Sequence, residues 1–153
     1  MTIYLAFTVR GNRSALVAAR ALSELLQRKG HHVLTTHLLA DDADGAEQSL
    51  TERQVYDRDI RWLESADLLI ADASGSSYGV GFEVGYVLGR SAQTGQRVLL
   101  VFDEARRPLI SRMVPGVNHS ACAVRAYRDP AELLDLVEAY LRVGTPAGGP
   151  TRI

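Results

Sequence analysis

The sequence predicts an α/β fold in which about five parallel strands form one doubly wound sheet covered by helices on both faces. Short apolar runs alternate with helical patterns along the chain, which is the strand–helix repetition of such folds. The runs lack a strict apolar–polar alternation, as expected of parallel strands that are buried on both faces. The length of 153 residues suits a single domain.

The first half of the chain is predicted to contain two strands and two helices. Residues 3–7 form the first strand. An apolar stripe with i, i+3, i+4, i+7 spacing begins at Ala15 and marks the first helix, which ends at Gly30. Residues 32–34 form the second strand, and a second helical pattern covers residues 50–65.

The second half supplies the other three strands. They are predicted from the apolar runs at residues 68–71, 98–102 and 121–124, and a helical pattern at residues 79–94 lies between the first two of these. Ligands of doubly wound folds bind at the carboxyl ends of the strands. The segments that follow each strand are therefore the first places to look for a site.

The last helix carries its own start signals. Asp129, Pro130 and Glu132 are typical of an N-cap, a first helical position and the third residue of a capping box. The glycines and prolines of residues 144–153 predict a flexible C-terminal tail. We therefore expect one domain over residues 1–143.

The composition argues against several classes of protein. The 17 Lys and Arg residues against 18 Asp and Glu residues give a net charge of −1, whereas duplex DNA binders usually carry a basic excess. The single cysteine, Cys122, cannot form an internal disulfide, and no apolar run approaches the ~20 residues of a membrane helix. We expect a soluble, cytoplasmic protein without nucleic-acid or membrane partners.

The most informative segment is the serine- and glycine-rich stretch of residues 71–85. Such a loop, following a strand and opening into a helix, presents backbone N–H groups and hydroxyls at the positive helix end. It predicts an anion site, with phosphate as the ligand. The glycine spacing is not the dinucleotide GxGxxG, and the sequence contains no P-loop motif. The alternative is a flexible loop before a poorly formed helix start.

Glu83 is predicted to lie opposite a glycine stripe on the helix that follows this loop. Gly81, Gly85 and Gly89 recur every four residues, although each costs ~1 kcal/mol relative to alanine inside a helix. The stripe predicts the close approach of another backbone, from the sheet or from a partner subunit. The helix dipole favours an ionised Glu83, a candidate nucleophile or charge stabiliser. A solvated surface glutamate is the alternative.

A second carboxylate, Asp59, is predicted to lie near the middle of an apolar helix face. That face is formed by Val55, Tyr56, Ile60, Trp62 and Leu63, whereas Asp57, Arg58 and Arg61 fall on the other side. Burial favours a protonated carboxyl, the form that a general acid needs near neutral pH. The alternative is a buried aspartate that the backbone or an arginine satisfies.

Three other positions carry weaker signals. Arg10 follows the first strand, where a guanidinium can bind phosphate through two N–H groups, although a lone surface arginine is commoner. His37 ends the second strand, and a ligand contact and a capping role are equally open. Cys122 is predicted to pack in the core. The remaining histidines have no ligand spacing, so no metal site is predicted.

Taken in order, these motifs resemble the nucleoside 2-deoxyribosyltransferase superfamily, and within it the Rcl-type 2′-deoxynucleoside 5′-monophosphate N-glycosidases. The resemblance covers roughly residues 3–142. It rests on the segments at residues 4–11 (YLAFTVRG), 34–37 (LTTH), 59–63 (DIRWL), 66–71 (ADLLIA), 77–85 (SYGVGFEVG) and 110–113 (ISRM).

The resemblance implies a flavodoxin-like sheet, a homodimer and catalysis without a cofactor. It also implies cleavage of the N-glycosidic bond through a covalent 5-phospho-2-deoxyribosyl-enzyme. Glu83 would be the nucleophile at C1′. Asp59 would protonate the departing base and then help to activate water, and Tyr4 would sit near the sugar and the nucleophile.

The resemblance further implies how the substrate is bound. The first loop and the serine-glycine loop would hold the phosphate, and a loop of the neighbouring subunit would complete the site with Ser111 and Met113. The substrate-binding residues expected on this basis, with His37 at the end of the second strand, are Thr8, Val9, Arg10, Gly11, His37, Ser77, Gly79, Gly81, Ser111 and Met113.

Two positions depart from the family pattern. Phe7 and Thr8 stand where the family usually has Gly-Ser, and a phenyl ring there is expected to narrow the base pocket or tilt the sugar. Asp72 stands where glutamate is common. We expect it to reach the sugar hydroxyls or to cap the loop.

The sequence therefore predicts a hydrolase of (2′-deoxy)nucleoside 5′-monophosphates that releases the free base and (deoxy)ribose 5-phosphate. One alternative is a nucleoside 2-deoxyribosyltransferase that moves the sugar to another base. Others are a non-catalytic nucleotide-binding module and a flavin protein. Arg10 and the serine-rich loop favour a phosphorylated substrate, and hence hydrolysis over transfer.

Overall fold

The computed structural model describes residues 1–8, 15–40 and 48–143. The predictions that concern Val9, Arg10, Gly11 and the tail at residues 144–153 therefore lie outside the described residues. Within the described ranges, no helix is both long enough and apolar enough to cross a lipid bilayer.

Five parallel strands form a single sheet, which confirms the predicted fold class. Their order is β2-β1-β3-β4-β5, the doubly wound order of flavodoxin-like folds, in which the direction of winding reverses between β1 and β3. The strands are β1 (Thr2–Ala6), β2 (His32–Leu34), β3 (Leu68–Asp72), β4 (Arg97–Asp103) and β5 (Cys122–Tyr127).

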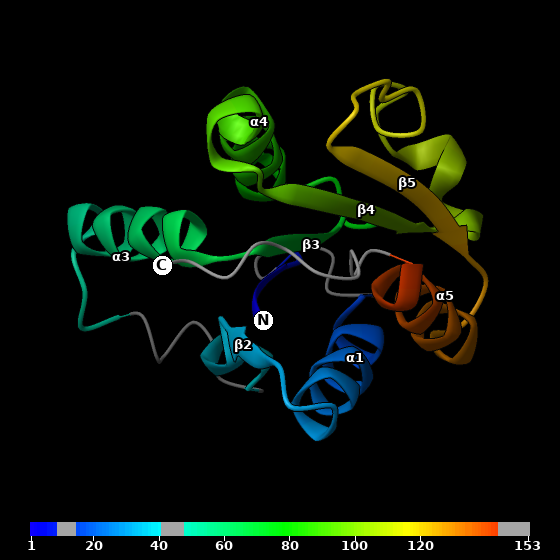
Figure 1. Cartoon of the computed structure of the whole chain (residues 1–153), viewed down its shortest axis with the longest axis horizontal. Coiled ribbons are helices and arrows are strands. Elements are labelled where there is room, and N and C mark those ends of the chain that lie inside the picture. The colour runs from blue at the N-terminus through cyan, green and yellow to red at the C-terminus, as the bar shows by residue number, and fades with distance from the viewer. Residues whose placement is uncertain (9–14, 41–47, 144–153) are drawn as a thin grey trace, which may run out of the picture.

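Helices cover both faces of the sheet, as Figure 1 shows. α1 (Leu16–Arg28) and α5 (Pro130–Val143) pack on one face, and α3 (Glu52–Ser65) and α4 (Tyr78–Thr94) pack on the other. Two short 3-10 helices, η1 (Thr36–Leu39) and η2 (Glu104–Leu109), follow β2 and β4. The sequence patterns did not predict them, because one or two turns are too short to show a periodicity.

The alternation of side chains along β1 decides which layer each residue faces. Ile3, Leu5 and Phe7 belong to the core cluster beneath α1 and α5, whereas Tyr4 and Ala6 belong to the cluster beneath α3 and α4. Tyr4 therefore points toward the helices that carry the two candidate carboxylates. Phe7, 4% exposed, packs with the opposite layer.

The local signals at two helix ends are confirmed. Gly30, which follows α1, has a φ of 79°, a conformation that glycine adopts without strain. The Asp129 carboxylate accepts the N–H of Glu132 at 2.9 Å at the start of α5. The Glu132 side chain departs from the expected capping box, because it accepts the N–H of Arg128 at 2.7 Å.

Candidate active site

A cleft of about 270 Å³ opens at the carboxyl edge of the sheet, beside the point where the strand order reverses. Two larger hollows lie at the opposite edge of the sheet. One, of about 490 Å³, is at the amino ends of β4 and β5, and the other, of about 540 Å³, is at the amino ends of β3 and β4. The smaller cleft alone gathers the candidate carboxylates. Its lining residues are Tyr4, Leu5, Ala6, Phe7, Leu38, Asp59, Ser77, Gly79, Val80 and Glu83.

The centre of the cleft is a hydrogen bond between a tyrosine and a glutamate. The Tyr4 hydroxyl donates to Glu83 Oε1 at 2.7 Å. Tyr4 is 1% exposed, and its burial, with the nearby charges of Glu83 and Asp59, raises its pKa far above the usual range. Tyr4 is therefore a permanent hydrogen-bond donor, and it fixes the Glu83 carboxyl on the first turns of α4.

Burial decides the protonation of Glu83. Removal from water and, to a smaller extent, the negative charge of Asp59 raise the pKa of Glu83, and the Tyr4 hydrogen bond lowers it. The net result is a pKa of about 7. Desolvation thus acts against the helix dipole, which favours the ionised form of Glu83. The carboxyl is thus poised to change its charge near neutral pH.

Asp59 does not lie unpaired in an apolar face. Its Oδ1 accepts a hydrogen bond from Arg58 Nε at 2.8 Å, and the two side chains are 23% and 15% exposed. The helical wheel placed Arg58 on the other side of the helix, but its long side chain folds back toward the cleft side. The guanidinium also lies 4.8 Å from the centre of the Trp62 ring.

His37 contacts the same wall of the site. Its ring meets the Trp62 ring edge-on, with 5.4 Å between centroids. The residue before this 3-10 helix, Thr35, has a φ of 71°, unusual for a β-branched residue, and its buried hydroxyl donates to the Leu5 carbonyl at 2.6 Å. Tertiary contact with β1 thus holds the turn that brings His37 and Leu38 beside the cleft.

The serine-glycine loop between β3 and α4 is tied to its surroundings. Ser77 is the N-cap of α4, and its hydroxyl accepts the Val80 N–H at 3.5 Å. Buried Asp72 accepts the Ser74 N–H at 2.8 Å and the Tyr127 hydroxyl at 2.6 Å. Of the two roles expected for Asp72, the structure therefore shows the capping of the loop.

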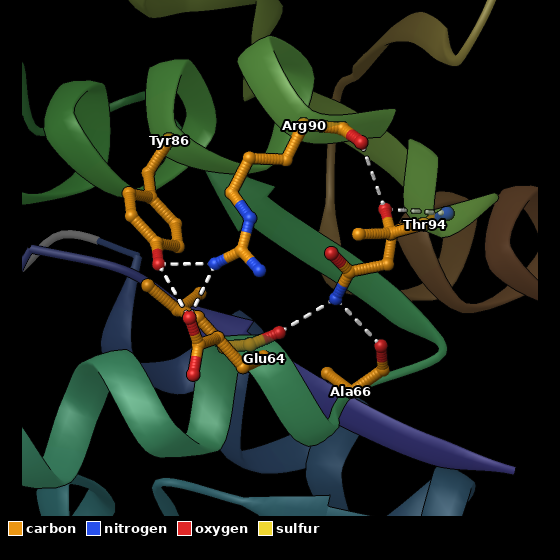
Figure 2. A network of polar contacts seen from close by, with 7 residues as sticks. Glu64, Ala66, Tyr86, Arg90 and Thr94 are labelled. Carbon is orange, nitrogen blue, oxygen red and sulfur yellow. Dashed lines mark hydrogen bonds and ion pairs between the residues drawn. The ribbon is translucent and has the colours of Figure 1, made fainter. Parts of the chain in front are cut away.

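Side-chain contacts also join the two helices that supply the carboxylates. Figure 2 shows Tyr86 and Arg90 of α4 pointing toward Glu64 of α3. The Tyr86 hydroxyl donates to Glu64 Oε1 at 2.8 Å, and Arg90 pairs with the same carboxylate. Nearby, the buried Gln96 amide donates to two carbonyls at the end of α3. These contacts set the spacing of α3 and α4.

A family model described as nucleoside 2-deoxyribosyltransferase matches residues 3–126 of the chain. The chain belongs to this family. A Thermofilum pendens relative, provisionally named a 2′-deoxynucleoside 5′-phosphate N-hydrolase, is 39% identical over 92% of this chain and 95% of its own length. The 5-hydroxymethyl-dUMP N-hydrolase of Danio rerio is 30% identical over 95% and 99% of the two chains.

A solved structure supports the fold assignment. The CMP N-glycosidase of Clostridium botulinum superposes with a TM-score of 0.67 over 92% of this chain and 99% of its own. The sequence identity is 20%, so the likeness concerns the fold alone.

The structure brings together five of the residues that sequence analysis selected for this family member. Three of them, Tyr4, Asp59 and Glu83, are the predicted catalytic residues, and Ser77 and Gly79 belong to the predicted phosphate loop. Thr8 lies beside them at the end of β1, 2% exposed, and its hydroxyl has no hydrogen-bond partner among the described residues.

Five other predicted site residues of the described ranges do not line the cleft of this protomer; two of them, Thr8 and His37, lie beside it, and the other three lie away from it. Gly81 is exposed on the outer side of α4, and Ser111 and Met113 are exposed in the segment after η2. Among the described residues, no group of three His, Cys, Asp or Glu side chains could hold a metal ion.

Sequence reasoning missed Arg58 and the cleft-lining Leu38. A helical wheel records the direction of each Cβ but not the reach of a long side chain, which is why Arg58 escaped it. Leu38 lies in an unpredicted 3-10 helix. The sequence offered one signal for Arg58, its position next to the oppositely charged Asp59, and no signal for Leu38.

Proposed function

We propose that this protein hydrolyses the N-glycosidic bond of (2′-deoxy)nucleoside 5′-monophosphates, releasing the free base and (deoxy)ribose 5-phosphate. The observation that carries the proposal is the pairing of Tyr4 and Glu83 at 2.7 Å in a cleft that Asp59 also lines. Two carboxylates of different environment facing one cleft are the machinery of glycoside cleavage. The names of the relatives support the same reaction class.

The first step breaks the glycosidic bond. An ionised Glu83 oxygen forms a bond to C1′ of the sugar while the C1′–N bond breaks, and its electron pair leaves with the base. In the form that reacts, Glu83 is ionised and Asp59 carries the proton. Asp59 gives this proton to the departing base, and the Tyr4 hydroxyl holds the Glu83 carboxylate in place. The products of this step are the free base and a glycosyl-Glu83 ester.

The second step releases the sugar. Asp59, now a carboxylate, takes a proton from a water molecule whose oxygen bonds to C1′ as the ester bond to Glu83 breaks. (Deoxy)ribose 5-phosphate leaves, and both carboxyl groups return to their starting states. The raised pKa of Glu83, about 7 in the free protein, makes the first step depend on its deprotonation.

The phosphate is assigned to the loop at the start of α4. Ser77, Gly79 and the first N–H groups of the helix form an anion site there, and the buried Thr8 hydroxyl supplies a donor on the β1 side. We assign Val9, Arg10 and Gly11 to the same phosphate from the sequence pattern. His37 is assigned to the base side of the cleft, next to Trp62.

We further propose a cytoplasmic homodimer in which the second protomer supplies Ser111 and Met113. The glycine stripe supports this, because a Cβ at Gly81, Gly85 or Gly89 would meet no atom within 4 Å. The sheet therefore does not approach the stripe, and a partner subunit is the explanation that we propose. Phe82 on the same helix is 55% exposed, and Met113 is 81% exposed, as expected for residues that a partner covers.

The deciding experiment is a chromatographic screen of ribo- and deoxyribonucleoside 5′-monophosphates for base release, with and without an added acceptor base. Hydrolysis predicts base release without the acceptor and little turnover of nucleosides that lack the phosphate, because binding at the phosphate helps to position C1′. A requirement for the acceptor would favour the transferase. Absence of turnover of every nucleotide, with binding retained, would favour a nucleotide-binding module.

The nucleophile has its own test. Glu83→Ala is expected to remove nearly all turnover while nucleotide binding persists, because the variant lacks the group that bonds to C1′. Retention of more than about a tenth of wild-type kcat, a barrier change below ~1.4 kcal/mol, would contradict the assignment.

A further inference from the structure

Helix α3 carries two arginine–carboxylate pairs with the same distance between Nε and a carboxylate oxygen. Arg53 Nε lies 2.8 Å from an Asp57 oxygen, and Arg58 Nε lies 2.8 Å from an Asp59 oxygen. The environments differ. The side chains of the first pair are 82% and 37% exposed, and those of the second are 15% and 23% exposed. The first is a surface pair of the kind that contributes little, whereas the second borders the cleft.

The Arg58 side chain is held from more than one side. Adjacent residues of a helix point about 100° apart, so Arg58 has to fold across the helix to reach Asp59. The Trp62 ring, one turn further along, supports the guanidinium at 4.8 Å, and the His37 ring packs against Trp62 at 5.4 Å. A guanidinium fixed in this way presents its N–H groups in a constant direction.

We propose that Arg58 is a positioning residue for Asp59 in the glycosidic cleavage, an inference that rests on the proposed function. Through its hydrogen bond Arg58 occupies one oxygen of the Asp59 carboxyl and leaves the other for proton transfer to the base. When that proton has moved to the base, a negative charge develops on Asp59. The adjacent guanidinium stabilises this charge, and Trp62 keeps the guanidinium in place.

This role predicts a dependence on the leaving group. A natural base departs slowly without protonation, whereas a p-nitrophenolate departs without help. The loss of Arg58 is therefore expected to slow the cleavage of nucleotides far more than that of p-nitrophenyl 2-deoxyriboside 5-phosphate. An arginine that only supports the fold would affect the two substrates alike.

The test compares Arg58→Met with Arg53→Met, which removes the exposed pair of the same helix, and measures kcat for both substrates. We expect Arg58→Met to lower kcat on a natural nucleotide about ten- to a hundredfold and on the activated substrate less than about threefold. Arg53→Met is expected to change neither by more than about twofold. Arg58→Lys, which keeps the charge, is expected to recover part of the loss.

A double-mutant cycle places the effect on Asp59. When Asp59 is already Asn, the change Arg58→Met is expected to cost no further activity on the nucleotide. An additive loss, or an equal loss on both substrates, would overturn the inference. Melting temperatures of all variants identify losses caused by unfolding, and Arg58→Lys then replaces Arg58→Met as the deciding variant.

The outcomes separate this inference from the proposed function. If Asp59→Asn shows the leaving-group dependence and neither Arg58 variant does, the role of Arg58 is wrong and the proposed function stands. If Asp59→Asn slows both substrates equally, the assignment of Asp59 as the acid fails, and the role of Arg58 fails with it.

Discussion

At the scale of single residues, the protonation of Glu83 results from opposing contacts that different parts of the chain supply. Burial and the charge of Asp59 raise its pKa, and the hydrogen bond from Tyr4 lowers it. Each contact comes from a different element, β1 for Tyr4, α3 for Asp59 and α4 for Glu83 itself. Substitutions of Tyr4 and of Asp59 are therefore expected to shift the pKa of Glu83 in opposite directions.

The acid limb of the kcat/KM profile for the activated p-nitrophenyl substrate tests this directly, because that substrate needs no proton from Asp59 and its limb follows the ionisation of Glu83 in the free enzyme. For the wild type we expect a limb near pH 7, where Glu83 loses its proton. Tyr4→Phe removes the contact that lowers the pKa of Glu83, so the limb should move to higher pH. Asp59→Asn removes the charge that raises this pKa, so the limb should move to lower pH. The activated p-nitrophenyl substrate keeps both variants measurable, and a shift of both limbs in one direction would contradict the assignment.

The same carboxyl links stability to pH. Because the pKa of Glu83 rises from 4.5 to about 7 on folding, the folded protein binds this proton more tightly than the unfolded chain. The resulting stabilisation is complete below about pH 4.5 and is lost as the pH rises through 7. Glutamine has no proton to lose in this range, so the stability of Glu83→Gln should not fall with rising pH in this way. The variant should be more stable than the wild type at pH 8, by up to about 3 kcal/mol, and equal to it near pH 4.

Urea unfolding at pH 4, 6 and 8 measures this difference. Glu24→Gln, at an exposed position of α1, is the control and should show no comparable trend. A Glu83→Gln variant whose advantage does not grow with pH would show that the Glu83 carboxyl is not desolvated in the folded protein.

At the scale of elements, the serine-glycine loop is positioned by the strand at the edge of the sheet. Tyr127 at the end of β5 donates to Asp72 at the end of β3, and Asp72 in turn holds the Ser74 N–H. The Ser74 hydroxyl accepts the Asp103 N–H at the end of β4 at 2.8 Å. Three neighbouring strands thereby determine where α4 begins, and with it the place of Ser77 and Glu83.

Tyr127→Phe tests this connection. The variant leaves the buried Asp72 carboxyl without one donor, which is expected to cost about 1–3 kcal/mol of unfolding free energy. A looser loop should also raise KM for a nucleoside 5′-monophosphate more than it lowers kcat. Thermal melting and steady-state kinetics measure the two effects. Tyr140→Phe on α5, remote from the cleft, is the control, and equal effects of the two changes would contradict the connection.

At the scale of the whole molecule, the outer face of α4 is the surface on which the proposed dimer depends. Its glycines leave open space beside the helix. On the flank toward α3, Phe82 and Tyr86 stack with 6.4 Å between ring centroids. Glycine persists there despite its cost in a helix, which indicates that a side chain at those positions would obstruct a contact.

Gly85→Leu is expected to dissociate the proposed dimer and, because the proposed partner would supply Ser111 and Met113, to lower activity in parallel. Within one protomer the added side chain meets no atom within 4 Å of its Cβ, so folding should survive. Light scattering after size-exclusion chromatography, kinetics and melting measurements give the three readouts. Gln27→Leu, exposed on the opposite layer, is the control. A Gly85→Leu variant that remains dimeric and active would exclude this face as the interface.

The sequence by itself determined the features that short-range patterns encode. Apolar runs predicted all five strands within a few residues, and the cap at Asp129 and the end at Gly30 are confirmed because such signals act within one helical turn. The glycine-rich segment and the order of motifs also led to the family. These inferences needed only neighbours along the chain.

Only the tertiary structure decided the electrostatics of the cleft. The helix dipole, visible in the sequence, favours an ionised Glu83, yet desolvation raises its pKa to about 7 against the opposing hydrogen bond from Tyr4. Asp59 meets Arg58 because a long side chain folds across the helix surface, which a wheel does not represent. The physical reason is the same in both cases. The free energy of a charge depends on its exposure to water and on groups within a few ångströms, and these come from elements far apart in the sequence.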